Sequence, residues 1–193
     1  FRNDPDRIEV GTFMIAAAML PGSSLRLIGC NAEHLGDFPN LLRQTGTKVD
    51  VEGEVISVQA PDILKPVSIT TDIYPGFPTD LQAQWATMLT QAHGDSTVTD
   101  TVYFDRFSYV PELSRLGAQM KLTKNTVHIQ GPKVLEGASV MSTDLRASVS
   151  LVLAGMAAKN TSEILRIYHL DRGYESLEDK LNAVGAKLSR AQE

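Results

Sequence analysis

The hydrophobic and polar positions of this chain follow the same order three times. Each repeat opens at an aspartate, at Asp6, Asp80 and Asp144, and runs into an apolar stretch of helical character. These stretches cover residues 13–20, 84–89 and 148–157. The first has almost no polar face, which predicts a helix that is buried on all sides. The threonines before Asp80 and Asp144 are expected to cap their helices, with the acid in the positive first turn.

A polar turn, a β-rich run and a second, amphipathic helix follow each apolar stretch. The β-rich runs cover residues 25–28, 97–102 and 164–168, and the helices cover residues 35–46, 111–117 and 177–185. The helices close at Gly46, Gly117 and Gly185, and a glycine there is a common C-cap signal. Two short strands, at residues 67–70 and 139–141, precede the second and third repeats.

A hairpin is predicted at the end of the first two repeats. Its strands are residues 49–51 and 55–58 in the first repeat, and residues 120–122 and 127–129 in the second. The turns contain Gly53 and Asn125, which tolerate the positive φ that such turns need. The third repeat has only residues 187–189 after its glycine, so we expect another chain segment to supply its last strand.

Three βαβαββ repeats, at about residues 1–62, 63–132 and 133–193, therefore predict one α/β domain with approximate threefold symmetry. Helices as apolar as residues 13–20 need cover on every side, which favours helices inside and sheets outside. The sequence begins at Phe1 and soon reaches Asp4-Pro5-Asp6, as the interior of a longer protein would. A second domain is expected to be absent from it.

Composition narrows the function classes. The 193 residues are 42% hydrophobic and 21% charged, as in globular proteins, and the net charge of −5 argues against a nucleic-acid binder. The apolar runs are shorter than the roughly 20 residues that span a bilayer, so no membrane partner is expected. Cys30 stands alone, which fits a reducing cytoplasm. The four histidines lack metal-ligand spacing, so neither a metal nor a cofactor is expected.

Five motifs, in order and in register, resemble the carboxyl-terminal half of UDP-N-acetylglucosamine enolpyruvyl transferases. They are PDRIE with GTF at 5–13, YPGFPTDLQAQ at 74–84, RF with VPEL at 106–113, TDLRAS at 143–148 and YHLDRGYE at 168–175. The resemblance covers nearly the whole chain. It implies one of two similar domains, each built from three such repeats, in an enzyme about twice this length. It also implies that this domain takes a short segment from the protein's amino terminus.

The resemblance further implies a reaction and a site. The enolpyruvyl group of phosphoenolpyruvate would move to the 3′-hydroxyl of UDP-N-acetylglucosamine with release of phosphate, which is the first committed step of peptidoglycan synthesis. Asp80 would be the base, and Asp144 an acid close to the reacting centre. Arg106, Arg146 and Arg172 would bind phosphoenolpyruvate, since arginines suit carboxylate and phosphate groups. The backbone of Val102 would contact the sugar nucleotide.

The same residues also have ordinary structural interpretations. Asp80 and Asp144 could be acids of a helix first turn, and Val102 could be a core residue of a strand. An isolated arginine is usually a solvated surface cation. One departure bears on Arg106: the family often has Glu-Asn before this arginine, where this chain has Phe104-Asp105.

The general acid of the reaction is missing from this sequence. In the family it lies on a mobile loop of the other domain, as a cysteine or an aspartate. Cys30 follows a strand-like run and is expected to be a buried or loop thiol instead. The family's Lys-Asn pair near the amino terminus is also absent. We therefore expect no turnover by this chain alone, and we expect the amino-terminal half of the enzyme to be its partner.

Two alternatives stay open. The first is the shikimate-pathway enolpyruvyl transferase, although its clustered Arg-Lys-Glu-Asp signature is not seen here. The second is a non-catalytic ligand-binding domain that has kept the fold. The retention of Asp80 and three arginines speaks against this second alternative.

Overall fold

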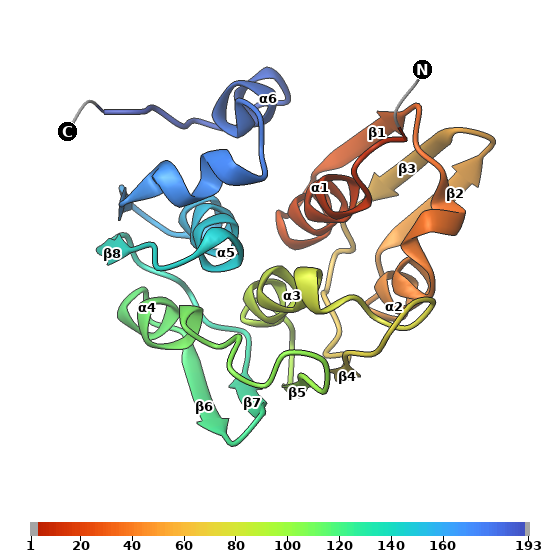
Figure 1. The fold of residues 1–193 in the computed structure, drawn as a ribbon. Coiled ribbons are helices and arrows are strands. Elements are labelled where there is room, and N and C mark those ends of the chain that lie inside the picture. The colour runs from red at the N-terminus through yellow and green to blue at the C-terminus, as the bar shows by residue number, and fades with distance from the viewer. Residues whose placement is uncertain (1–3, 192–193) are drawn as a thin grey trace.

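The computed structural model describes residues 4–191 of the chain. Three helices occupy the centre of the molecule, and sheets and further helices surround them (Figure 1). The central helices are α1 (Arg7–Met19), α3 (Gln82–Leu89) and α5 (Leu145–Ala157). Helix α3 packs against both α1 and α5. The predicted arrangement of helices inside and sheets outside is confirmed.

The central helices are buried because their sequences are apolar on nearly every side. In α1 all residues from Gly11 to Met19 are buried, and in α3 every residue is buried. Trp85 of α3 anchors an aromatic cluster, with ring centroids 5.9 Å from Phe38 and 5.2 Å from Phe77. Its indole nitrogen donates to the carbonyl of Val67 at 3.1 Å, so the polar end of the ring is also satisfied.

Residues 4–191 form three sheets, which lie around these helices. The first has the order β1-β3-β2, formed by β1 (Ser24–Ile28), β3 (Val55–Gln59) and β2 (Lys48–Glu52). The second has the order β4-β5-β7-β6, formed by β4 (Ile69–Thr70), β5 (Asp95–Thr99), β7 (Thr126–Gln130) and β6 (Gln119–Thr123). The third pairs β8 (Ser139–Met141) in parallel with β9 (Glu163–Leu165).

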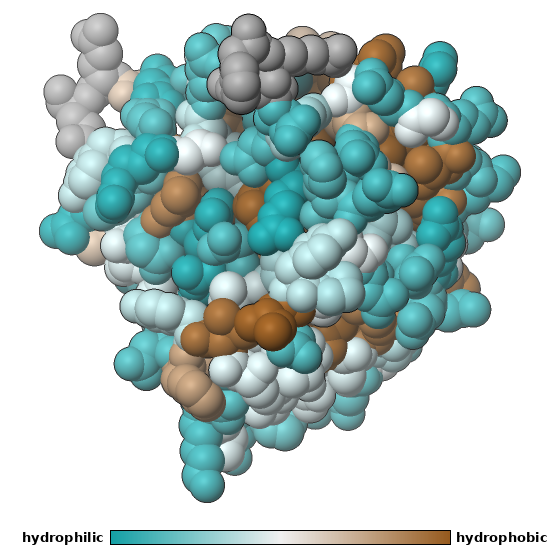
Figure 2. All heavy atoms as spheres, turned by 45° about the vertical axis from the view of Figure 1, so that its right-hand side comes forward, coloured by the Kyte–Doolittle hydropathy of each residue, from teal (hydrophilic) through white to brown (hydrophobic). Residues whose placement is uncertain are grey.

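Outer helices complete each repeat. They are α2 (Phe38–Gln44), α4 (Tyr109–Arg115) and α6 (Leu177–Ala183). In the described part of the chain, three 3₁₀ turns connect the elements, at η1 (Ala32–Leu35), η2 (Thr79–Leu81) and η3 (Ile167–Arg172). The face in Figure 2 is mainly hydrophilic, with separate hydrophobic patches.

The middle repeat has all the predicted elements within the described chain. It runs β4, α3, β5, α4, β6, β7, and its sheet pairs β4 with β5 in parallel and β5 with β7 in antiparallel fashion. The first repeat begins at α1, and the third shows no hairpin after α6 within residues 4–191. The residues at 187–189 form no strand, so the third sheet has two strands here.

Several predicted boundaries were wrong, for local reasons. The run at 97–102 ends as a strand at Thr99, and the run at 164–168 ends at Leu165. Arg166 has a left-handed φ of 58°, which turns the chain out of the sheet and into η3. The helix predicted at 35–46 begins at Phe38, because the chain first turns at Gly36.

No helix among residues 4–191 is long and apolar enough to cross a membrane. The same residues contain no group of three or more His, Cys, Asp or Glu side chains that could hold a metal ion. Cys30 is buried, and burial raises the pKa of its thiol.

Candidate active site

The carboxylate of Asp80 lies between two arginine side chains. Its Oδ1 accepts a hydrogen bond from Arg106 Nη1 at 2.5 Å and another from Arg146 Nε at 3.1 Å. All three side chains are partly exposed, with 34% of Asp80, 21% of Arg106 and 18% of Arg146 accessible. The cluster therefore combines a solvent-accessible carboxylate with two cations that a ligand can reach.

The 3₁₀ turn η2 presents Asp80 ahead of helix α3. Because α3 begins only at Gln82, the side chain of Asp80 does not cap the helix, and Leu81 at the cap position makes no side-chain hydrogen bond. Gln84 Nε2 donates to the carbonyl oxygen of Asp80 at 3.1 Å, which holds the backbone of the turn. The carboxylate stays free for the arginines.

The loop after β5 presents Arg106. Gln82 Nε2 donates to the carbonyl of Arg106 at 3.2 Å, which ties this loop to the helix that follows Asp80. The guanidinium also stacks over the ring of Tyr103, with 4.9 Å from its carbon to the ring centroid. The departure at Phe104-Asp105 therefore leaves Arg106 in contact with Asp80.

Arg146 lies in the first turn of α5, which Asp144 caps. Asp144 Oδ1 accepts from the backbone nitrogens of Arg146 at 2.8 Å and Ala147 at 2.9 Å. Its Oδ2 accepts from Ser108 Oγ at 2.5 Å, across to the segment that follows Arg106. Asp144 thus performs the capping role that was one of its two interpretations, and by this role it fixes Arg146. Both predicted threonine caps were wrong. Asp144 itself caps α5, and Thr79 lies within η2 while Leu81 holds the cap position of α3.

Both carboxyl groups are held in the ionised form. Burial raises the pKa of Asp80, but the charge of Arg146 and the hydrogen bonds from both arginines outweigh it, so this pKa lies below its usual value. Burial likewise raises the pKa of Asp144, but hydrogen bonds from Ser108 and from the helix backbone lower it further than burial raises it. Asp80 is therefore an anion at neutral pH.

Arg172 stands apart from this cluster. It is exposed at the end of η3 and forms no side-chain hydrogen bond or ion pair with any other residue in the range 4–191. The next residue, Gly173, lies against Leu145 at the start of α5, where an added Cβ would be 2.6 Å from a Leu145 methyl carbon. This close approach brings the backbone of Arg172 to the end of α5 that carries Arg146.

A buried polar cluster links the segments of Asp80 and Arg172. The hydroxyl of Tyr174 lies 2.8 Å from Thr12 Oγ1, and Gln84 Nε2 donates to Thr12 Oγ1 at 3.3 Å. Burial raises the pKa of Tyr174 despite these hydrogen bonds. Tyr174 therefore packs inside the protein.

Val102 is not a core residue of a strand, which corrects one of its two interpretations. It lies beyond the end of β5 and is 43% exposed. Its backbone nitrogen donates to Asp100 Oδ1 at 2.9 Å, which turns the chain away from the sheet.

Residues 1–181 match the family model for EPSP synthase (3-phosphoshikimate 1-carboxyvinyltransferase). This chain belongs to the EPSP synthase family. Curated relatives named UDP-N-acetylglucosamine 1-carboxyvinyltransferase include one from Chlorobaculum parvum, 53% identical over all of this chain and 45% of the relative. Another, from Desulfosudis oleivorans, is 48% identical over 96% of this chain and 44% of the relative. The chain therefore spans somewhat under half the length of these relatives, and the resemblance drawn from the five motifs is confirmed.

Solved structures of the family agree with the fold. The enolpyruvyl transferase NikO from Streptomyces tendae superposes with a TM-score of 0.84 at 29% identity, over 95% of this chain and 43% of that one. An EPSP synthase from Acinetobacter baumannii superposes with a TM-score of 0.72 at 16% identity, over 97% of this chain and 44% of that one, and shares the fold.

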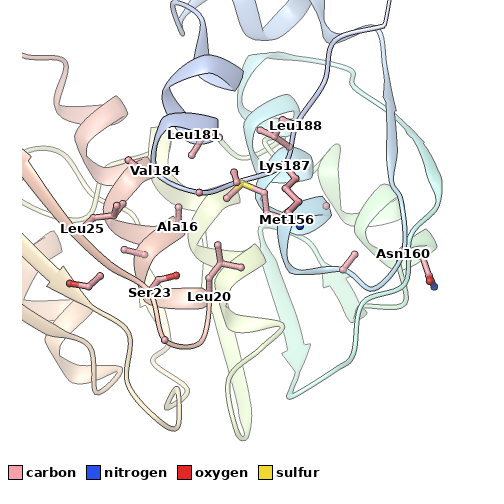
Figure 3. A pocket seen from close by; sticks show the side chains of 17 residues that line it. Ala16, Leu20, Ser23, Leu25, Met156, Asn160, Leu181, Val184, Lys187 and Leu188 are labelled. Carbon is pink, nitrogen blue, oxygen red and sulfur yellow. The ribbon is translucent and has the colours of Figure 1, made fainter.

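A pocket of about 670 Å³ lies at the opposite end of the central helices from Asp80. Ala16 and Leu20 of the α1 end, Met156 of α5 and Leu181 of α6 line it (Figure 3). The pocket lies between the first and third repeats. None of its lining residues belongs to the cluster of Asp80, Arg106 and Arg146, so it is separate from the candidate active site.

Two further residues, Gln82 and Asp100, build the site, and no sequence motif indicated their roles. Gln82 fixes the backbone of Arg106, and the fully buried Asp100 accepts hydrogen bonds from the loop that carries Val102. Asp100 stands inside the run predicted as strand 97–102, and an acid within a β-rich run was the available signal.

Proposed function

We propose that this chain is the part of a UDP-N-acetylglucosamine enolpyruvyl transferase that carries the base and three phosphoenolpyruvate-binding arginines. The observation that carries the proposal is the Asp80 carboxylate held between Arg106 and Arg146. The name shared by the curated relatives supports the choice of UDP-N-acetylglucosamine as the acceptor. Peptidoglycan synthesis, and through it cell shape and division, would be the cellular role, carried out in the cytoplasm.

Asp80 would take the proton of the acceptor's 3′-hydroxyl. The hydroxyl oxygen adds to C2 of phosphoenolpyruvate while an acid protonates C3, which gives a tetrahedral intermediate. The C2–O bond to phosphate then breaks, C3 loses a proton, and the enolpyruvyl ether and phosphate remain. An anionic ligand that draws the arginines toward itself would raise the pKa of Asp80 and make it a stronger base when the acceptor is bound.

The arginines would bind the two anionic groups of phosphoenolpyruvate. Arg106 and Arg146 have partly exposed guanidinium groups, and each uses only one nitrogen in its hydrogen bond to Asp80. Planar guanidinium groups suit the paired oxygens of carboxylate and phosphate. Arg172, exposed and unpaired within residues 4–191, would complete the set when the substrate is bound.

The other half of the enzyme would supply the general acid and the missing strands. The edge of β8 that faces away from β9 already has hydrogen-bond partners in the side chains of α4. Glu112 accepts from Met141 N at 2.7 Å, and Arg115 donates to the Ser139 carbonyl at 3.0 Å. Strand β9 pairs with β8 alone among the described strands. A segment of the other half would therefore extend the third sheet from β9, near the pocket between the first and third repeats.

A chimeric enzyme tests this function. In it, this chain replaces the matching 45% of the Chlorobaculum parvum relative. Phosphate release from phosphoenolpyruvate is measured with UDP-N-acetylglucosamine and, separately, with shikimate 3-phosphate. We expect turnover with the sugar nucleotide, and we expect the isolated chain to be inactive.

The other outcomes identify the alternatives. Turnover with shikimate 3-phosphate alone would assign the chain to the shikimate pathway. A folded chimera that binds a substrate but releases no phosphate would favour a non-catalytic binding domain. Turnover by the isolated chain would show that the acid lies within these residues.

A further inference from the structure

Asp100 is a fully buried carboxylate whose oxygens collect four hydrogen bonds. It is 0% exposed, and no cation pairs with it in the described part of the chain. Oδ1 accepts from Thr71 Oγ1 at 2.7 Å and from the backbone nitrogens of Val102 at 2.9 Å and Tyr103 at 2.8 Å. Oδ2 accepts from Thr79 Oγ1 at 2.6 Å. Buried polar groups in native proteins are hydrogen-bonded, and both oxygens of this carboxyl group have donors.

These donors come from three segments, two of which lead into the candidate site. Thr71 follows β4, and Asp100 follows the parallel neighbour β5, so both loops leave the sheet at the same end. Thr79 immediately precedes Asp80 in η2. Val102 and Tyr103 begin the loop that leads to Arg106.

The backbone of Asp100 is itself fixed. Its nitrogen donates to the Asn125 carbonyl at 2.9 Å, and Asn125 Nδ2 donates to its carbonyl at 2.8 Å. Asn125 belongs to the turn between β6 and β7, which connects two strands of the sheet. The carboxylate therefore connects a 3₁₀ turn and a long loop to a regular sheet.

We propose that Asp100 is a positioning residue that keeps Asp80 and the loop carrying Val102 and Arg106 in register for catalysis. The role in catalysis rests on the proposed function. The geometric part does not, because the carboxylate of Asp80 meets Arg106 only while both segments keep their places. Displacement of a reacting group by about 1 Å can lower a rate by about a hundredfold.

The test removes the hydrogen bond that the Thr79 hydroxyl donates to Asp100 Oδ2. Asp100→Ala would leave four donors unpaired and is expected to unfold the chain, so Thr79→Val is the informative variant. Thr79→Ser keeps the hydroxyl. Thr47→Val is the control for loss of a threonine hydrogen bond, since the Thr47 hydroxyl bonds Thr45 at 2.8 Å in the first repeat.

The first measurement is the pKa of Asp80 in the isolated chain. NMR of its carboxyl carbon monitors the titration. We expect Thr79→Val to raise this pKa toward the ordinary value of about 3.9, because the arginines lose their fixed partner. Thr79→Ser and Thr47→Val should leave it at the value of the unmodified chain. A contribution of Asp100 to stability alone would leave it unchanged in all three.

The second measurement is phosphate release by the chimeric enzyme. We expect Thr79→Val to lower kcat by on the order of tenfold to a hundredfold, with KM for the sugar nucleotide changed by less than about twofold. An unchanged pKa, or an unchanged kcat in an active chimera, would overturn the proposal. An inactive unmodified chimera would instead refute the proposed function, while the pKa of Asp80 would still decide whether Asp100 positions it.

Discussion

Helices α3 and α5 begin at equivalent places in neighbouring repeats, and a Thr-Asp pair precedes each. At α5, both oxygens of Asp144 accept hydrogen bonds from the helix start and from Ser108. At α3, Asp80 lies in the 3₁₀ turn η2 that precedes the helix, and its carboxylate meets two arginines. Asp6 at α1 behaves like Asp144, because its Oδ1 accepts from Ile8 N at 2.7 Å.

The difference shows how one sequence signal can serve structure or chemistry. A carboxylate that caps a helix has its acceptor capacity used by the backbone. One extra turn of 3₁₀ helix removes Asp80 from that role and leaves its oxygens to other side chains. In this fold two copies of the repeat retain the cap, and the copy that lacks it carries the candidate base.

The largest expected effect follows from replacing Asp80. In the chimeric enzyme, Asp80→Asn should lower kcat by about 10²- to 10⁴-fold, because an amide cannot accept the proton of the hydroxyl. The free energy of unfolding should change by less than about 1 kcal/mol, since the ion pairs are partly exposed. Stopped assays of phosphate release and urea unfolding measure the two quantities. An unaffected rate would remove Asp80 from the mechanism.

A smaller effect is expected at Arg146. Arg146→Lys keeps the charge but loses the planar set of donors, so KM for phosphoenolpyruvate should rise by about tenfold. The NMR-measured pKa of Asp80 should rise in the same variant. Arg115→Lys is the matched control, because Arg115 lies on the surface of α4 and 60% of its side chain is exposed. A rise in KM for the sugar nucleotide alone would place Arg146 at a different part of the site.

The cap at α5 should affect stability more than the equivalent aspartate at α3. Asp144→Ala removes the acceptor for two backbone nitrogens and should cost about 1–2 kcal/mol in the free energy of unfolding. Asp144→Asn, which keeps a capping oxygen, should cost less than about 0.5 kcal/mol. Urea unfolding of the isolated chain compares them with Asp80→Ala. Equal losses for Asp80→Ala and Asp144→Ala would contradict the contrast between the two helix starts.

The repeat could be predicted from the sequence because its signals are local. Helix-period apolar runs, hairpin turns and terminal glycines each lie within about ten residues, and they produced the three repeats and the buried helices. The strand ends were not predictable in this way. The run at 97–102 keeps its β-rich composition past Thr99, yet the carboxylate of Asp100 bends the backbone there.

The sequence predicted which residues belong to the candidate site, but it did not predict which of them contact one another. Asp80 and Arg146 are 66 positions apart, and their contact depends on how α3 packs against α5. No local pattern distinguishes Asp80, which pairs with two arginines, from Asp144, which caps a helix, because the sequences TDLQ and TDLR are nearly the same. The burial of Asp100 was not predictable, because it depends on the loops that fold around this residue.

The smallest expected effect separates the two aspartates by pH and salt. The pKa values of Asp80 and Asp144 are lowered in the folded chain, so each contributes stability that is present above the unfolded value of about 3.9 and is lost as the pH falls through the folded value. Urea unfolding between pH 6 and pH 3 should therefore show falling stability, with a shallower fall in Asp80→Asn and in Asp144→Asn. Each difference should be below about 1 kcal/mol.

Added salt should shrink the Asp80 difference, because screening weakens ion pairs at the surface. The Asp144 difference should persist, because its partners are hydroxyl and backbone groups, and an equal response of both to salt would mean that Asp80 too is held by neutral donors.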